Sequence, residues 1–191
     1  MLRNSRERFG WVSIVIHWLM AIAIIGMFAL GIWMVDLNYY DDWYHRAPWV
    51  HRSVGMLLFF LLLFRLGWRL TNPVPEILGQ WWERLIAIWV HRGHYLFMFA
   101  VIISGYLIST AYGRGVEVFD WFEVPALLDA DKGRESSAGF IHMLLAWGFM
   151  GYICMHAAAA LKHHLIDKDA TLLRMLGLSK TEKKKEKNDE V

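Results

Sequence analysis

Cysteine is nearly absent from this sequence of 191 residues, since Cys154 stands alone. A single cysteine excludes an intrachain disulfide, a Cys-x-x-Cys zinc pair and the Cys-x-x-Cys-His motif that attaches a c-type haem covalently. Charge is also scarce: charged residues make up 20% of the chain, and the formal net charge is +2. So small a positive excess excludes nucleic acid as a partner by bulk attraction. Proline occurs four times, and Pro73 with Pro75 marks a break between two apolar stretches.

Apolar residues are abundant, with hydrophobic types making up 57% of the chain and aromatic types 15%. Four apolar stretches lie at about 11–35, 50–70, 85–110 and 138–165. Each is long enough to cross a bilayer, which takes about 20 residues of helix. Open strands are excluded, because their edges would leave backbone groups unpaired in lipid. The sequence therefore predicts an all-α protein, an integral membrane four-helix bundle in contact with lipid.

Lysine and arginine are distributed unevenly around these stretches. Fifteen of the 20 lie before the first stretch, around the turn between the second and third, or at and after the end of the fourth. By the positive-inside rule, this bias places both termini in the cytoplasm. Residues 1–178 are predicted to form one four-helix domain, and residues 179–191 a charged, disordered cytoplasmic tail.

Histidine is the most informative polar residue type, with nine in the chain. A polar side chain costs free energy inside a bilayer, so histidines within the apolar stretches are functional candidates. His142 and His156 are 14 residues apart, and a helix turns such residues to the same face, about 21 Å apart along its axis. His156 shares its depth with His17, and His142 shares its depth with His51. The sequence thus predicts two histidine pairs, one near each membrane face.

Two facing imidazoles without other ligands suit the axial positions of a b-type haem iron. A zinc site calls for four ligands, and no Cys, Asp or Glu accompanies these pairs at their depth. A metal-ion transporter is disfavoured because it would need acidic groups between the ligands. For each histidine alone, the alternative is an ordinary packing or hydrogen-bonding residue, but four at paired depths favour ligands.

The sequence resembles the bacterial four-helix cytochrome b561 proteins over about residues 8–178. The motifs that carry this resemblance are IHW at 16–18, HRSVG at 51–55, Arg65 and Arg69 ahead of NPVP, HRGH at 91–94, and HAAAALKHH at 156–164 followed by DKDATLLRM. The resemblance implies a multi-pass protein of the bacterial inner membrane that holds two non-covalent b haems. It implies His17 and His156 as axial ligands of the inner haem iron, and His51 and His142 as those of the outer haem iron.

The resemblance also implies an electron-transfer function. Members of this family include the superoxide oxidase, an oxidoreductase that passes electrons from periplasmic superoxide to ubiquinone. Others are membrane subunits of hydrogenases and other dehydrogenases. The first hypothesis for this chain is therefore transmembrane electron transfer that oxidises superoxide and reduces ubiquinone.

The charge of the predicted outer connections keeps a second hypothesis open. These connections carry nine acidic residues against five basic ones, a balance that repels superoxide at long range. It suits a cationic periplasmic donor such as cytochrome c, or a docking dehydrogenase subunit. A local funnel would still attract an anion, and the candidates for it are His45, Arg46, Arg52, Arg114 and Arg134.

The third apolar stretch carries the polar residues His91, Arg92 and His94. Both histidines lie in the inner half, so they are rival ligands for the inner haem only. Together with Arg92, they are also candidates for contacts with haem propionates or a quinone. The alternative is plain helix packing and interfacial charge.

Two further pairs of polar residues lie near the inner membrane face. Lys162 and His163 are candidates for binding quinone carbonyls or relaying protons, and the alternative for them is an interfacial polar role. Arg65 and Arg69, four residues apart, either neutralise propionates of the inner haem or extend to the membrane surface.

Overall fold

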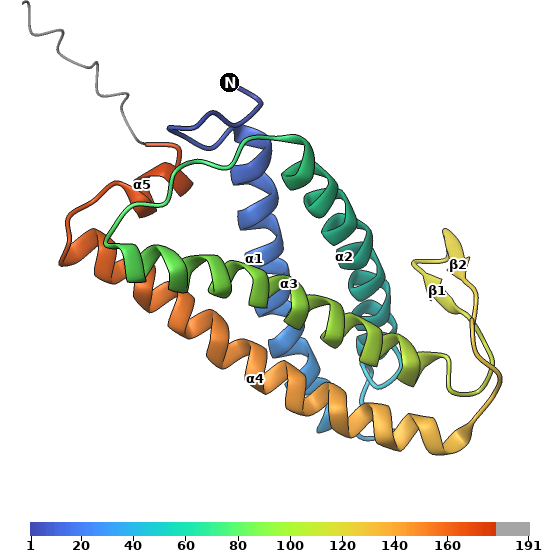
Figure 1. Ribbon diagram of the computed structural model, residues 1–191. Helices are drawn as coiled ribbons and strands as arrows, with labels where there is room; N and C mark the ends of the chain where they lie inside the picture. The colour runs from blue at the N-terminus through green and yellow to red at the C-terminus, as the bar shows by residue number, and fades with distance from the viewer. Residues whose placement is uncertain (179–191) are drawn as a thin grey trace, which may run out of the picture.

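The structure, a computed structural model, describes residues 1–178, so the predicted tail at 179–191 lies outside the described residues. Four long helices dominate it (Figure 1): α1 (Trp11–Val35), α2 (Arg46–Thr71), α3 (Trp81–Ser109) and α4 (Lys132–Leu165). All four are long and apolar enough to cross a membrane. The predicted four-helix membrane architecture is therefore confirmed.

Three of the helices, α2, α3 and α4, begin earlier than the sequence predicts, and polar capping residues account for the early starts of α3 and α4. At the start of α3, Gln80 and Glu83 form a capping box in which the Glu83 carboxylate accepts the Gln80 N–H at 2.8 Å. At the start of α4, the Asp131 carboxylate accepts the Gly133 N–H at 2.9 Å. Hydrophobicity locates the membrane span, whereas side-chain capping locates the helix end.

The long connection between α3 and α4 contains a feature that the sequence analysis missed, an antiparallel hairpin of β1 (Val116–Val118) and β2 (Phe122–Val124). Val116 and Val118 are buried against α2. The fully buried hydroxyl of Ser53 on α2 accepts the Phe119 N–H at 3.1 Å and donates to the Glu117 carbonyl at 3.4 Å. The hairpin is thus attached to the end of the bundle.

The long helices pack as two antiparallel pairs, α1 with α2 and α3 with α4 (Figure 1). The α3–α4 contact is the most extensive, and α2 also packs against α3. By contrast, α4 makes little contact with α1 and almost none with α2. A compact apolar cluster joins the helices near the middle, and its buried members are Ile16, Met20, Leu58, Leu62, Met98 and Phe149.

Both described chain ends lie at the same end of the bundle, which we call the terminal end. There the Trp18 indole N–H on α1 donates to the Met175 carbonyl at 2.8 Å, which ties the short helix α5 (Thr171–Met175) to α1. The opposite end, which carries the β-hairpin, is called the hairpin end. The terminal end corresponds to the predicted cytoplasmic side, and the hairpin end to the predicted outer side.

The Ser53 contact predicts how firmly the hairpin is held. Ser53→Ala removes the acceptor of the Phe119 N–H, and an unsatisfied buried donor costs about 1–3 kcal/mol. We expect amide exchange of residues 116–124, measured by hydrogen exchange and mass spectrometry, to accelerate about tenfold or more. Ser109→Ala is the control, because that hydroxyl bonds only to the Gly105 carbonyl of its own helix. Unchanged exchange in Ser53→Ala would show that the apolar contacts alone hold the hairpin.

Candidate functional site

At the hairpin end, His51 on α2 and His142 on α4 lie together, with ring centroids 6.2 Å apart and planes at 78°. Two imidazoles bonded to one metal at about 2.0 Å have centroids about 6 Å apart, so this spacing fits a shared iron. The His142 Nδ1–H donates to the Val101 carbonyl at 2.9 Å, and Nδ1 lies 3.1 Å from the Ser104 hydroxyl. That bond leaves Nε2 of His142 without a proton and available as a ligand atom.

His51 supplies a second indication that this pair holds a bound group. Its Nδ1 is buried and has no hydrogen-bond partner within residues 1–178, and such orphaned polar atoms are rare in the absence of a ligand. Both rings also lie against helical glycines. A Cβ at Gly31 would lie 3.3 Å from His51, and one at Gly105 would lie 3.1 Å from His142. The sequence analysis missed both glycines, since nothing local distinguishes them from ordinary small residues in membrane helices.

At the terminal end, four histidines from three helices converge. The His17 ring on α1 lies 6.4 Å from that of His156 on α4, centroid to centroid. The α3 residues His91 and His94 also face His156, at 5.8 and 4.7 Å. The structure therefore brings both predicted ligands and both predicted rivals into one cluster.

Helix packing distinguishes among these four histidines. His91 and His94 meet His156 across the α3–α4 interface, the most extensive helix contact in the bundle, and a flat macrocycle between them would have to separate these two helices. His17 and His156 instead belong to helices that make little mutual contact, and the same holds for the helices of His51 and His142. Centroid distance alone would also admit His91 with His156. Spacing and packing together favour the two pairs that the sequence predicts.

A guanidinium belongs to the terminal-end cluster. Arg65 on α2 is partly buried, and its Nη2 lies 3.3 Å from Nδ1 of His17. Arg69, one turn later, is exposed and lies over the Tyr95 ring at 5.8 Å. Arg92 is also exposed and lies over the Trp89 ring at 5.4 Å. Of the three candidate arginines, only Arg65 contacts a histidine of the cluster.

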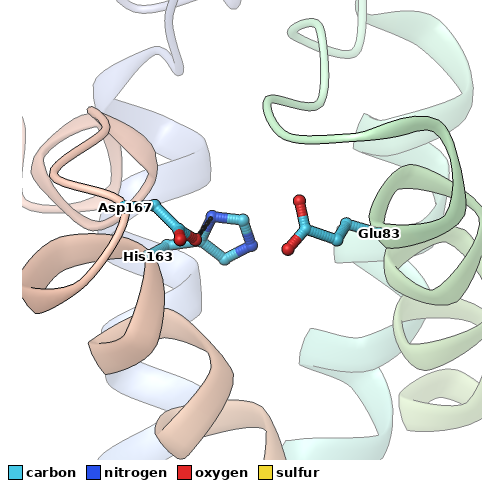
Figure 2. A group of neighbouring side chains, drawn as sticks. All are labelled: Glu83, His163 and Asp167. Atoms are coloured by element: carbon cyan, nitrogen blue, oxygen red, sulfur yellow. Dashed lines mark ion pairs between the residues drawn. The ribbon is translucent and has the colours of Figure 1, made fainter.

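Closer to the terminal surface, Lys162 and His163 form an ion-pair cluster with Glu83, Asp167 and Asp169. The Lys162 ammonium pairs with Glu83 and, at 2.8 Å, with Asp167. Nδ1 of His163 lies 2.7 Å from the Asp169 carboxylate and 3.2 Å from that of Asp167. Figure 2 shows Glu83 on α3 facing His163, in the last turn of α4, and Asp167, just after the end of α4. The three carboxylates were missed, because from the sequence they are ordinary charges of helix ends and loops.

Hydrogen bonds within this cluster favour the charged form of Asp169. Partial burial raises the pKa of Asp169, but hydrogen bonds from Thr171 and His163 outweigh burial and hold that pKa below its usual value. Glu83, His163 and Asp167 also offer three ligand atoms within 4.8 Å of one another. The ammonium of Lys162 already neutralises two of these groups, so we assign no metal to them.

The hairpin end carries the residues predicted to attract a donor. An open groove beside the hairpin is lined by Arg52 and Arg114 together with Glu117 and Glu123. Of the five residues proposed for a cationic funnel, these two arginines share the groove, and Arg134 instead donates to the Asp129 carbonyl at 2.7 Å. The groove therefore mixes both signs of charge.

Comparison with known proteins agrees with this architecture. The family model of prokaryotic cytochrome b561 matches residues 8–178. The chain is 51% identical over 182 residues to cytochrome b561 homolog 2 of Escherichia coli (strain K12), a match that covers 94% of this chain and 96% of the relative. It is 29% identical to the probable superoxide oxidase CybB of Yersinia pestis, covering 89% and 96% of the two chains. Cytochrome b561 homolog 1 of Escherichia coli (strain K12) is 26% identical, with 89% and 97% covered.

These matches extend over nearly the whole described chain, including every histidine discussed above. The family and the four membrane-spanning helices agree with a multi-pass protein of the inner membrane. The chain therefore belongs to the prokaryotic cytochrome b561 family, and it is a membrane electron-transfer cytochrome of the b-haem type.

Proposed function

We propose that this cytochrome holds two non-covalent b haems and moves electrons from a donor at the hairpin end to a quinone at the terminal end. One observation carries the proposal: each end has a pair of imidazoles that joins α4 to a helix it hardly contacts. When bound, a b haem supplies one-electron chemistry. Two such centres along α4 connect the two membrane faces.

The residues of the two pairs have distinct tasks in this proposal. His17 and His156 hold the terminal-end iron, and His51 and His142 hold the hairpin-end iron. The Val101 carbonyl keeps the proton of His142 on Nδ1, which orients the ring and makes Nε2 a stronger ligand. Arg65 lies where it can neutralise a propionate of the terminal-end haem.

Quinone reduction belongs at the terminal end in this scheme. Lys162 and His163 present an N–H donor each, which suits the two-electron, two-proton reduction of a quinone to a quinol. Nδ1 of His163 lies 2.7 Å from the Asp169 carboxylate, and this contact orients the imidazole ring. The imidazole then passes a proton toward the reduced carbonyl oxygen and regains one from the terminal surface.

Superoxide is the donor that we favour. Two superoxide anions, one quinone and two protons give two O₂ molecules and one quinol, so atoms and electrons balance. The relative named a probable superoxide oxidase supports this assignment, as do Arg52 and Arg114 in the groove beside the hairpin. The second candidate, a cationic protein donor or dehydrogenase subunit, is favoured by the excess of acidic residues in the predicted outer connections.

The ligand assignment predicts which haem each histidine holds. His156→Ala removes the terminal-end haem and leaves the other, while His142→Ala does the reverse, because each variant leaves one iron with a single protein ligand. Haem content per protein, measured by the pyridine haemochrome assay on the purified protein, is expected to halve in each variant. Retention of both haems in either variant would contradict the assignment.

His91 tests the rival pairing of His91 with His156. Its ring lies near that of His156, but the two residues are on α3 and α4, which pack extensively against each other. His91→Ala is expected to retain both haems with unshifted absorption maxima in the reduced-minus-oxidised spectrum. Loss of one haem would make His91 a ligand and would remove that role from His17.

The donor is tested by anaerobic stopped-flow absorption on the detergent-purified protein. Superoxide is expected to reduce the haems rapidly, and a ubiquinone analogue to reoxidise them. His142→Ala, which lacks the hairpin-end haem, serves as the control and is expected to be reduced at least tenfold more slowly. Haems that are inert to superoxide but reduced by a cationic cytochrome c would favour the second candidate.

A further inference from the structure

We propose that Arg65 gives electron transfer its direction, by raising the reduction potential of the terminal-end haem above that of the hairpin-end haem. The inference rests on the proposed function, because it takes His17 and His156 as the ligands of the terminal-end iron. It goes further by naming the charge that makes the two otherwise similar histidine pairs unequal.

The guanidinium of Arg65 lies inside the terminal-end cluster and has no acidic partner among residues 1–178. Its Nη2 is 3.3 Å from Nδ1 of His17, and its Nη1 is 4.0 Å from Sδ of Met20, a side chain that is 3% exposed. The ion pairs formed among residues 1–178 involve Lys162 and His163 and do not include Arg65. An arginine keeps its charge at every physiological pH, so this end of the bundle holds a permanent cation.

In the hairpin-end pair, the hydrogen-bond partners of His142 are neutral groups. His142 contacts the Val101 carbonyl and the Ser104 hydroxyl. The nearest cation in the sequence, Arg52, is exposed, and its Nε donates to the Pro48 carbonyl at 3.3 Å. In the described part of the chain, no charged side chain hydrogen bonds to His51 or His142.

This asymmetry has a definite sign. A cation beside an iron opposes its oxidised form, which carries one more positive charge, and the low dielectric of the membrane interior strengthens that effect. At the hairpin end, the Val101 carbonyl accepts a hydrogen bond from the His142 Nδ1–H, which makes the ring a stronger electron donor and favours the oxidised iron. Both influences place the higher potential at the terminal end, so electrons move toward the proposed quinone.

The sign does not depend on which partner Arg65 takes when haem is bound. Ligation through Nε2 leaves the proton of His17 on Nδ1, and that N–H cannot accept a bond from the guanidinium. If Arg65 keeps its place, its charge acts directly on the iron. If it turns to a propionate, its removal uncovers a negative charge. In both cases, loss of Arg65 lowers the terminal-end potential.

The test is a spectroelectrochemical redox titration of the full-length detergent-purified protein in a His142→Ala background, where only the terminal-end haem is expected. We expect Arg65→Gln to lower its midpoint potential by about 59 mV or more, which is a tenfold change in a one-electron equilibrium. Arg65→Lys keeps the charge and is expected to restore most of that potential. Arg84→Gln is the matched control, because it removes an exposed arginine from the first turn of α3, where the Arg84 Nε–H donates to the Gly79 carbonyl at 2.8 Å.

A second pair of variants tests the charge of Arg65 without removing the arginine. Met20→Glu places a carboxylate beside the guanidinium and is expected to lower the midpoint potential, whereas Met20→Gln, its neutral counterpart, is not. Equal shifts of the midpoint potential in Arg65→Gln and Arg84→Gln, or an unchanged midpoint potential in Arg65→Gln, would overturn the inference. Loss of the remaining haem in both Arg65→Gln and Met20→Glu would also overturn it, because Arg65 would then be needed for haem retention.

These outcomes are separable from failure of the proposed function. If the His142→Ala background itself keeps two haems, or holds none, the ligand assignment fails before Arg65 is changed. If the His142→Ala protein keeps one haem and the midpoint potential of that haem does not change in Arg65→Gln, the ligand assignment stands and only the inference about direction is wrong.

Discussion

The hydrocarbon core of the bilayer offers no water to polar groups, and the rest of this structure depends on that constraint. Backbone groups are satisfied within four long helices, and apolar side chains face lipid: Ile22 is 69% exposed and Leu96 is 72% exposed. The same constraint turns imidazoles toward the interior, where they meet one another. A protein with many apolar residues therefore has a small apolar core and two polar clusters within the bundle.

The helix α4 organises both clusters, because it carries one member of each proposed ligand pair. Its close packing partner is α3, which supplies a carbonyl to His142 and two further imidazoles to the terminal-end cluster. Its partners in the ligand pairs lie on α1 and α2, with which it packs little. Extensive packing on α3 fixes the position of α4, and its sparse contact with α1 and α2 suits the proposed placement of a flat cofactor between these helices.

The two ends of the molecule differ in charge as well as in shape. At the terminal end, Arg65 lies beside the histidines, and an ion-pair cluster around Lys162 covers the surface beyond them. At the hairpin end, the histidine pair contacts neutral groups, and the charges are confined to the groove beside the hairpin. In the electron path proposed above, this difference in charge makes the two histidine pairs unequal.

Periodicity and hydropathy were enough to predict the four spans and the common depth of each histidine pair, because both depend on distances along one helix. They did not predict the hairpin, which depends on the Ser53 hydroxyl meeting a segment 66 residues away. They left Arg65 and Arg69 equivalent, although contact with His17 distinguishes Arg65. Local spacing determines which face of a helix a side chain occupies, whereas the approach of other helices determines what that face meets.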